Sequence, residues 1–335
     1  MDSLTQITLG AAVGEAVLGK KVGNKALFWG AVAGTIPDLD VLTKYFVDDP
    51  IRAIELHRGF SHSILFCVLF APIFGFLIHK INRDSNTTWK NWAWLMFWGL
   101  VTHPILDSFT TWGTQFFWPL EWRIAFKNIF VIDPLYTLPY LIFLPMLMRL
   151  KKANPKRQFY NKMALGLSSL YMVFSLGMKF YTYQIFEEVL VKQNIDFLDI
   201  ETKPSPFNTF LWTANVRTEQ QIFIGYYSVF DENEEIDFQG HDINENLIEH
   251  IKNEKIVQRL KHISKDWYTI QNKGNVLFFN DLRFGQMGIN SKEAKFAFSY
   301  QLVQENGTWK AIENKKRPDQ IKPLLIGLWN RIKGE

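Results

Sequence analysis

Cysteine is almost absent from this 335-residue sequence, which contains only Cys67. One cysteine excludes an intrachain disulfide framework and any zinc module built from several cysteines. An excess of charge of one sign is also missing, because 37 Lys and Arg residues oppose 33 Asp and Glu residues. The net charge of +4 is too small to indicate nucleic-acid binding. With 47% hydrophobic and 21% charged residues, the composition also excludes a disordered chain.

Recognisable leader and catalytic motifs are missing as well. The first ten residues, MDSLTQITLG, lack the basic segment that opens a secretory signal peptide, so we expect the first apolar segment to stay in the mature protein. We find no nucleophile elbow, phosphate-binding loop or HExxH motif.

The two halves of the sequence differ in charge. Residues 1–183 hold 18 Lys and Arg against 11 Asp and Glu, a net charge of +7, whereas 184–335 hold 19 against 22, a net charge of −3. Eight of the twelve Trp residues also lie in the first part. We therefore expect a mainly α fold, with a polytopic helical membrane domain over 1–183 and an extracytoplasmic α+β domain over 184–335.

Six apolar segments approach the roughly 17–25 residues that cross a bilayer as a helix. They are 3–19, 26–43, 60–79, 91–109, 131–148 and about 162–182. The first two are weakly hydrophobic but carry Gly10-x-x-x-Gly14 and Gly30-x-x-x-Gly34. Such spacing lets two helix backbones approach closely in lipid. Close packing of these two spans and an incidental occurrence of the glycines both remain open.

The distribution of Lys and Arg predicts the orientation of the spans. Three connecting loops, 19–25, 79–90 and 149–162, hold twelve basic residues, whereas the alternate loops, 44–58 and 110–130, hold five. Basic loops stay in the cytoplasm. We therefore expect the N-terminus and, after six spans, the C-terminal domain on the outer side.

Seven ionisable residues fall within or beside these apolar segments, where such groups are costly and usually functional. They are Asp38 and Asp40 in PDLD, His57 and His62 in HRGFSHS, His103 and Asp107 in THPILD, and Asp133 in IDP. With the expected topology all seven lie at the outer membrane face. Each alone would more often cap a helix or pair with arginine, but their convergence predicts one shared site.

The types and spacing of these seven residues suit a metal site. His103 and Asp107 are one helical turn apart and project from one face of a helix. Pro37 predicts a helix break beside Asp38 and Asp40. Three imidazoles with several carboxylates match Zn²⁺ first, with Mn²⁺ or Fe²⁺ as alternatives, and match Mg²⁺ or Ca²⁺ less well. All seven residues are therefore candidate ligands.

Candidates for catalysis are Asp38, Asp40 and Arg58. A carboxylate that is not needed as a ligand can bridge two metals or act as a general base. Arg58 could bind a phosphate or carboxylate bidentately, or could simply extend to the membrane interface. Glu15 is a further acid in the first segment, and we expect it to pair with Lys20 or Lys21, with a proton path as the alternative.

These motifs resemble those of the YdjM-like, membrane-bound, metal-dependent hydrolases of bacteria. The resemblance covers about residues 1–150 and rests on MDSLTQITLGAAVGEAVLGKK, GTIPDLDVL, HRGFSHS, THPILDSFTTWGTQFFWP and IDPLYTLP. It implies a helical protein of the bacterial inner membrane with a metal site and hydrolase activity. The residues that fall on the family's motifs are Asp38, Asp40, His57, His62, His103 and Asp107. Many members carry a Thr-His pair where this chain has Thr5-Gln6, so an amide replaces a fourth imidazole.

Residues 184–335 show the patterns of an α+β domain. The expected strands are 208–216, 220–229, 275–282 and 295–303, and the expected helices are 244–263 and 319–332. Lys273-Gly274 and Asn306-Gly307 predict turns, the second within a hairpin. We expect Asp281 and Arg283 to form a salt bridge.

Two classes of function remain open. The first is a metal-dependent hydrolase acting on a lipid-like or amphiphilic ester or phosphoester at the outer leaflet, because an interfacial site meets headgroups first. A metal-independent phosphatase with His103 as nucleophile is a rival within this class, but it lacks the arginine-rich companion motifs. The second class is a non-enzymatic membrane protein with a structural metal site, or one that binds a partner or transports a solute. Seven polar residues exceed the needs of one closed tetrahedral site, which favours the hydrolase.

Overall fold

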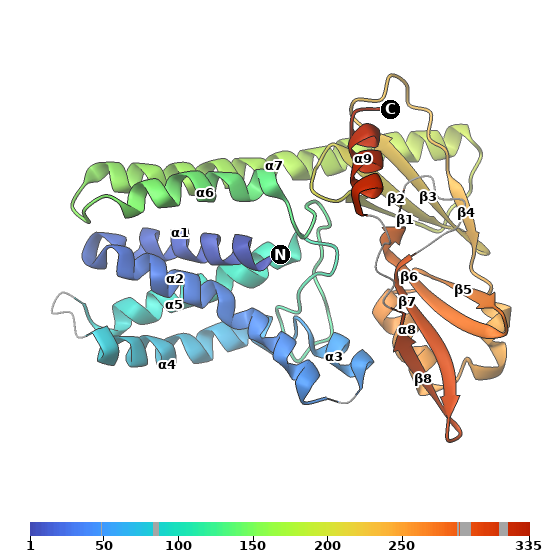
Figure 1. The fold of residues 1–335 in the computed structure, drawn as a ribbon, viewed down its shortest axis with the longest axis horizontal. Helices are drawn as coiled ribbons and strands as arrows, with labels where there is room; N and C mark the ends of the chain where they lie inside the picture. The colour runs from blue at the N-terminus through green and yellow to red at the C-terminus, as the bar shows by residue number, and fades with distance from the viewer. Residues whose placement is uncertain (48, 83–86, 287, 289–295, 315–320) are drawn as a thin grey trace. The chain divides into compact units, whose positions relative to one another are not determined.

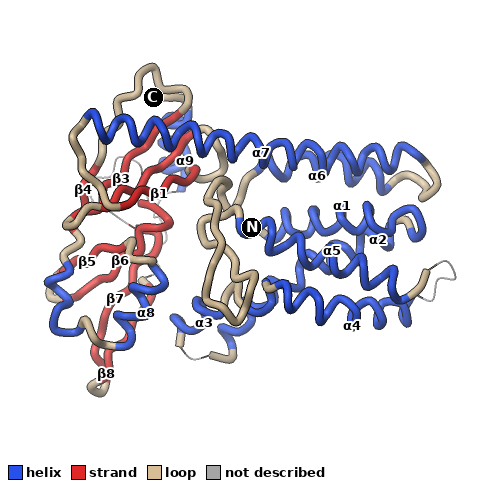
Figure 2. Tube along the Cα trace, turned by 180° about the vertical axis from the view of Figure 1, so that it is seen from behind, coloured by secondary structure: helices blue, strands red, loops and turns tan. Residues whose placement is uncertain are grey.

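The structure is a computed structural model that describes residues 1–47, 49–82, 87–286, 288, 296–314 and 321–335. The chain divides into two units. Unit 1 comprises Met1–Phe46, Leu56–Gly177 and Pro206–Asn208, and unit 2 comprises Val47–Glu55, Met178–Ser205 and Thr209–Glu335. Helices build unit 1, whereas all the labelled strands belong to unit 2 (Figure 2). Three predicted features extend beyond the described residues. They are the basic loop 79–90 at Arg83, the strand 295–303 at residue 295 and the helix 319–332 at residues 319–320.

Unit 1 is a bundle of helices that run side by side (Figure 1). Its elements are α1 (Ser3–Val22), α2 (Asn24–Thr35), the 3₁₀ helix η1 (Ile36–Tyr45), the 3₁₀ helix η2 (Phe60–His62), α4 (Ile64–Asn82), α5 (Trp89–Ser108), α6 (Pro134–Met148) and the first part of α7 (Pro155–Lys192). The short helix α3 (Pro50–Leu56) lies almost wholly in unit 2. α1 packs against α2, α5 and α6, and α4 packs against α5.

Glycines bring α1 and α2 into backbone contact. A Cβ atom added to Gly10 would overlap the Gly30 carbonyl oxygen, and one added to Gly14 would overlap the carbonyl oxygen of Ala26. At Gly34 an added Cβ would meet the carbonyl oxygen of Gln6. The two small-residue motifs therefore form the close helix contact that their spacing indicates.

Proline ends α2 near the position that the sequence indicates. Pro37 has no backbone N–H and disfavours a regular α-helix at the residue before it. The α-helix accordingly ends at Thr35, and the chain continues as η1, which carries Asp38 and Asp40. The tighter 3₁₀ turn thus sets how these two carboxylates are presented.

Two of the described helices, α4 and α7, are long and apolar enough to cross a membrane, with mean hydropathies of 2.2 and 1.3. α6 is apolar but has 15 residues. The six predicted spans all contain helix, but six crossings are not confirmed. α2 has only 12 residues, and α1 and α5 carry charged or polar side chains such as Glu15 and Asp107.

Glu15 pairs with an arginine of α7, so the expected partners, Lys20 and Lys21, are wrong. Nε and one terminal nitrogen of Arg157 lie 2.7 and 2.6 Å from the two carboxylate oxygens. Both side chains are almost completely buried. A buried carboxylate needs such a bidentate partner, because ionised groups are costly in an apolar interior. Long-range packing supplies this partner, and local sequence does not reveal it.

The described residues of unit 2 form two antiparallel four-stranded sheets. The first has the order β1 (Asp199–Pro204), β2 (Leu211–Arg217), β3 (Gln221–Ser228) and β4 (Gln239–Asp242). The second has the order β5 (Tyr268–Lys273), β6 (Val276–Gln286), β7 (Phe296–Glu305) and β8 (Thr308–Glu313). The helical elements are η3 (Glu245–Ile251), α8 (Lys255–Ser264) and α9 (Ile321–Ile332). The last turns of α7 cover the first sheet, where Phe186 and Leu190 are buried with Trp212.

The predicted strands correspond to β2, β3, β6 and β7. β1, β4, β5 and β8 were not expected, because segments such as DIETKP and TWKAIE carry too many polar residues. The single helix expected over 244–263 is wrong, since it divides into η3 and α8. Asn306-Gly307 does connect β7 to β8 as a two-residue turn with positive φ at both positions, and Arg283 does bind Asp281 at 2.6 Å.

The segment before His57 belongs to unit 2. Arg259 of α8 donates to Asp49 at 2.6 Å and to Glu55 at 2.7 Å, and Ile51 is buried in the core of the second sheet. Burial alone would raise the pKa of Asp49 and of Glu55, but the hydrogen bonds from Arg259 outweigh it, and both pKa values are lowered. Within unit 2, an ion-pair network therefore holds the segment from Asp49 to Glu55 against α8.

Candidate metal centre

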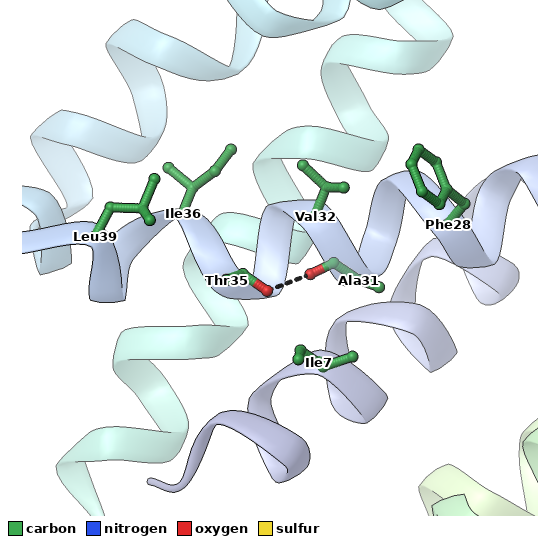
Figure 3. A pocket seen from close by; sticks show the side chains of 7 residues that line it. All are labelled: Ile7, Phe28, Ala31, Val32, Thr35, Ile36 and Leu39. Carbon is green, nitrogen blue, oxygen red and sulfur yellow. Dashed lines mark hydrogen bonds between the residues drawn. The ribbon is translucent and has the colours of Figure 1, made fainter.

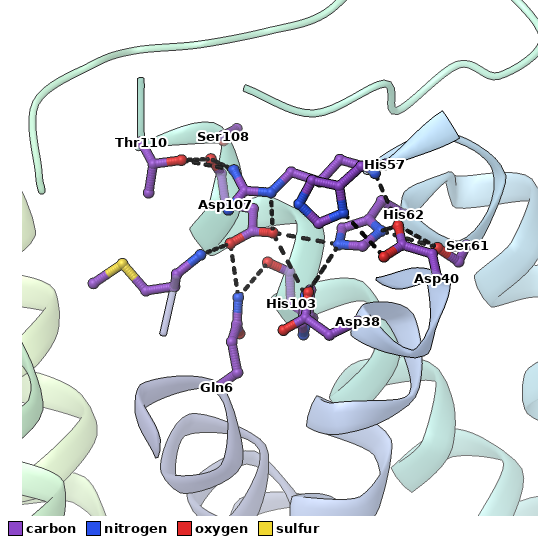
Figure 4. Close-up of polar contacts among 12 residues, drawn as sticks. Gln6, Asp38, Asp40, His57, Ser61, His62, His103, Asp107, Ser108 and Thr110 are labelled. Atoms are coloured by element: carbon purple, nitrogen blue, oxygen red, sulfur yellow. Dashed lines mark hydrogen bonds and ion pairs between the residues drawn. The ribbon is translucent and has the colours of Figure 1, made fainter. Parts of the chain in front are cut away.

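Polar side chains from several elements of unit 1 meet at one end of the helix bundle (Figure 4). η1 contributes Asp38 and Asp40, and η2 contributes His62. The last turns of α5 contribute His103 and Asp107, which lie four residues apart on one helix face. Elements far apart in the sequence thus present their acids and imidazoles to one place.

Four of the seven expected residues form a group that could hold a metal ion. Asp38, His62, His103 and Asp107 each offer one ligand atom, and these atoms all lie within 4.8 Å of one another. Nε2 of His62 lies 3.2 Å from Nε2 of His103 and 3.3 Å from Oδ2 of Asp107. Oδ1 of Asp38 lies 3.3 Å from Nε2 of His103 and 3.5 Å from Nε2 of His62.

Hydrogen bonds on the far side of each imidazole orient the two rings. Nδ1 of His103 lies 2.6 Å from the carbonyl oxygen of Gly34. Because a carbonyl only accepts, Nδ1 of His103 must be the donor, and the lone pair of the neutral ring is then on Nε2. Nδ1 of His62 lies 3.3 Å from the Asp40 carboxylate and 3.0 Å from the Ser61 hydroxyl. Metal-binding histidines commonly have such a partner, a carboxylate or a backbone carbonyl, at the ring nitrogen that does not bind the metal.

Asp107 is surrounded by donors but directs one oxygen into the cluster. Its Oδ1 accepts from Gln6 Nε2 at 3.0 Å and from the ammonium group of Met1. Its Oδ2 lies 3.0 Å from Nε of Arg58 as an ion pair, and among the described residues it accepts no hydrogen bond. A buried carboxylate oxygen that accepts no hydrogen bond and lies 3.3–3.5 Å from two imidazole nitrogens is suited to bind a metal ion.

The chemistry of the donor set fits a small divalent cation. Two imidazole nitrogens and two carboxylate oxygens face one point, and lone pairs so close together repel unless a cation or protons lie between them. Bonds of about 2.0–2.2 Å in a tetrahedral set require ligand atoms about 3.3–3.6 Å apart. Five of the six separations between these ligand atoms are 3.2–3.5 Å, close to that requirement, and the four atoms together lie within 4.8 Å of one another.

One side of the cluster is accessible. The side chains of His62, His103 and Asp107 are 0% exposed, whereas Asp38 is 25% exposed. His57 is 34% exposed, and its ring lies 6.1 Å from that of His62. Asp38 and His57 therefore mark the mouth of the site, through which a ligand could reach it.

Asp40 and His57 lie beside the four-residue group. Asp40 Oδ1 is 3.0 Å from Nδ1 of His57, and its Oδ2 accepts from the backbone N–H of Arg58 at 2.8 Å. Arg58 itself has a positive φ of 57° and directs its guanidinium to Asp107 and to the hydroxyl of Thr110. Asp40 thus holds the histidine loop in place, and Arg58 balances the charge of Asp107.

Asp133 also lies outside the four-residue group. It caps the start of α6 by accepting hydrogen bonds from the backbone of Leu135 and Tyr136, and it accepts from the Tyr171 hydroxyl at 2.9 Å. Pro134 follows it at the first helical position. The motif IDP is accordingly a helix start, in which an acid before proline satisfies free N–H groups.

The structure adds contacts that sequence reasoning left open or did not identify. Gln6, for which direct coordination and hydrogen bonding were both considered, donates to Asp107 and to the His103 carbonyl. The Gly34 carbonyl had no side-chain signal that could have identified it. Ser61, in contrast, lies inside HRGFSHS beside His62 and could have been inferred from that position.

The fold and site define a class of protein: a helical bundle with a buried histidine–carboxylate cluster, followed by a β-sheet domain. A model of the YdjM inner membrane protein family matches residues 1–186, more than half of the chain, and the chain belongs to this family. The inner membrane protein YbcI of Escherichia coli (strain K12) is 28% identical over 145 residues, which cover 41% of this chain and 82% of YbcI. No solved structure matches the chain. The protein is accordingly an inner membrane protein.

Proposed function

We propose that this protein is a multi-pass, metal-dependent hydrolase of the inner membrane that cleaves a lipid-like ester or phosphoester at the outer leaflet. One observation carries the proposal: four convergent ligand atoms come from three fully buried side chains and from Asp38, which is partly exposed. A purely structural metal site is closed, whereas a catalytic one keeps an accessible position.

The distribution of apolar surface supports several membrane crossings. Helices α4, α6 and α7 expose large apolar side chains, which a water-exposed bundle would bury. Examples at 37% exposed or more are Leu65, Leu69, Ile73, Leu77, Leu138, Leu141, Ile142, Leu170 and Val173. Polar side chains such as Glu15, His62 and Asp107 are buried inside the bundle. A bilayer around the bundle accounts for this arrangement.

Asp38, His62, His103 and Asp107 would hold the ion. A divalent cation there would polarise a phosphoryl or carbonyl oxygen of the substrate and stabilise the charge that develops on it. Arg58 is buried beside Asp107, and its positive charge partly offsets the negative charges of Asp38 and Asp107. Gln6 holds the other oxygen of Asp107, so the ligand oxygen keeps its direction.

His57 is placed to move a proton at the mouth of the site. Its Nδ1 lies 3.0 Å from Oδ1 of Asp40, so that carboxylate orients the ring. Nε2 of His57 is then available to accept a proton from the attacking water or to return it to the leaving group. A His–Asp pair beside an accessible cluster is a common arrangement for this role.

The surroundings of the mouth favour an amphiphilic substrate. The ring centroids of Trp112 and His57 lie 6.0 Å apart, and those of Phe60 and Trp118 lie 5.0 Å apart. Leu39, Phe60 and Trp118 are 39–53% exposed. A polar mouth surrounded by exposed apolar side chains suits a molecule with a polar head and an apolar chain.

Purified full-length protein tests the proposal directly. Metal-loaded protein in lipid nanodiscs should hydrolyse phosphatidic acid or a long-chain ester, whereas His103→Ala should lose both bound metal and turnover. His250→Ala is the matched control, because His250 is an exposed residue of unit 2, and it should change neither quantity. If no lipid ester or phosphoester is cleaved and removal of the metal unfolds the protein, a structural metal site replaces the proposal.

A further inference from the structure

An apolar groove lies along α2 and η1, beside the candidate metal centre. Its volume is about 290 Å³, and it is lined by Ile7, Phe28, Ala31, Val32, Thr35, Ile36 and Leu39 (Figure 3). Thr35 is the one polar residue among them, and its hydroxyl donates to the carbonyl of Ala31 in its own helix at 2.9 Å. The groove therefore suits an apolar ligand that forms no hydrogen bonds.

Residues that line the groove are direct neighbours in the chain of residues that form or support the cluster. Leu39 lies between Asp38 and Asp40 on η1, and Ile7 follows Gln6, which donates to Asp107. Gly34, one residue before Thr35, accepts the hydrogen bond of His103. Leu39, at the η1 end of the groove, is thus the direct chain neighbour of Asp38, the partly exposed member of the cluster.

The length of the groove agrees with that of one lipid chain. From Phe28 to Leu39 the path includes seven α-helical and four 3₁₀ steps, about 18 Å in total. One leaflet contributes about 15 Å to the hydrocarbon core of a bilayer. Phe28 and Leu39 are 60% and 53% exposed, so a chain could enter from the side without crossing the bundle.

The geometry points to this groove as the site that holds one acyl chain of a membrane lipid whose polar head is bound at Asp38 and His57. This assignment rests on the proposed function, since it identifies the substrate class of the same site as a long-chain lipid. Specificity then comes from how well the chain packs against the groove, because a chain that leaves the surrounding lipid tails gains no hydrophobic transfer free energy.

Photolabelling tests the groove without requiring turnover. The probe is a phosphatidic acid with a diazirine at the middle of a palmitoyl chain, mixed with full-length protein in phosphatidylcholine nanodiscs containing a chelator. Adducts should concentrate in peptides that contain Ile7 or residues 28–39. Val32→Trp, which fills the groove, should lower their yield about tenfold. Val173→Trp is the matched control on exposed α7 and should leave the yield unchanged.

Two results would overturn the assignment. One is an even spread of adducts over all exposed apolar helices, including α4 and α7, in the wild-type protein. The other is an adduct yield in residues 28–39 that Val32→Trp does not lower. Because labelling is measured without metal, an inactive protein that still labels in the groove would contradict the hydrolase proposal and leave the groove in place.

Discussion

The Nε2 atoms of His62 and His103 lie 3.2 Å apart, although 41 residues separate them in the sequence. Contacts at Nδ1 orient each ring. Nδ1 of His62 contacts Asp40 and Ser61, and Nδ1 of His103 donates to the Gly34 carbonyl. Unless a proton lies between them, two ring nitrogens at this distance repel each other through their lone pairs. A cation between them removes that repulsion, so the pair links the fold to metal binding.

Replacing either histidine of this pair should remove the metal. We expect His62→Ala and His103→Ala to lower metal affinity by more than about 100-fold, because loss of an outer contact alone costs about 10–100-fold. His57→Ala is the control, since His57 lies outside the four-residue group. Metal content of the purified variants after dialysis measures the effect. Equal retention of metal by all three variants would show that the cluster is not the metal site.

The two aspartates of η1 should behave differently. Asp38 offers a ligand atom, whereas Asp40 contacts Nδ1 of His57 and Nδ1 of His62. We expect Asp38→Asn to lose most of the metal, and Asp40→Asn to keep it with affinity weakened by about 10–100-fold while losing turnover. Ser61→Ala, which removes a smaller contact to His62, should have a weaker effect than either. Calorimetric titration with Zn²⁺ compares the variants, and the opposite order for the aspartates would refute these roles.

The α1–α2 contact makes a prediction about stability. Gly14→Ala places a Cβ against the backbone of Ala26, and overpacking of this kind costs about 1–3 kcal/mol. Gly166→Ala on α7 is the control, because its Cβ would meet nothing and alanine favours a helix by about 0.5–1 kcal/mol. Thermal unfolding in detergent should therefore occur at a lower temperature for the first variant only. A similar shift in both would mean that the glycines are incidental.

The sequence predicted features that depend on local chemistry. Pro37 indicated the break before Asp38, and Asn306-Gly307 indicated a hairpin. The small-residue motifs left the α1–α2 contact as one of two possibilities, and the structure shows that contact. Apolar runs located the helices of unit 1. These signals arise from neighbouring residues, so the rest of the fold is not needed to interpret them.

What the sequence could not supply depends on contacts between distant segments. Arg157 as the partner of Glu15 and the division of 244–263 into two helices follow from packing. Within the site, the sequence could not separate Asp38 from Asp40, because both flank Leu39. Only the three-dimensional arrangement shows that one faces His103 while the other faces His57.

Membrane topology is a separate prediction from the twelve-to-five division of basic residues between alternate loops. Basic loops remain in the cytoplasm. Reporter fusions at Asn154 and at Glu335 should therefore give opposite signals, cytoplasmic for the first and extracytoplasmic for the second. The same signal from both would place the cluster on the cytoplasmic side or change the number of crossings.

The ion-pair network of Arg259 should make the segment before His57 sensitive to acid. Because Arg259 lowers the pKa of Asp49 and Glu55 in the folded protein, its stabilisation is complete above their unfolded values of about 3.9 and 4.3, and is lost as the pH falls through the lower folded values. Partial exposure limits the effect of Arg259→Gln to about 1 kcal/mol at neutral pH. Hydrogen exchange of the α3 amides in the full chain, corrected for intrinsic rates, measures this effect. Protection should be lower in Arg259→Gln than in the wild-type protein near pH 7, and the two proteins should differ less near pH 3.5. Lys310→Gln, which breaks the exposed pair with Glu305, is the control and should leave α3 unchanged. A difference that stays constant with pH would mean that Arg259 acts by packing and not by charge.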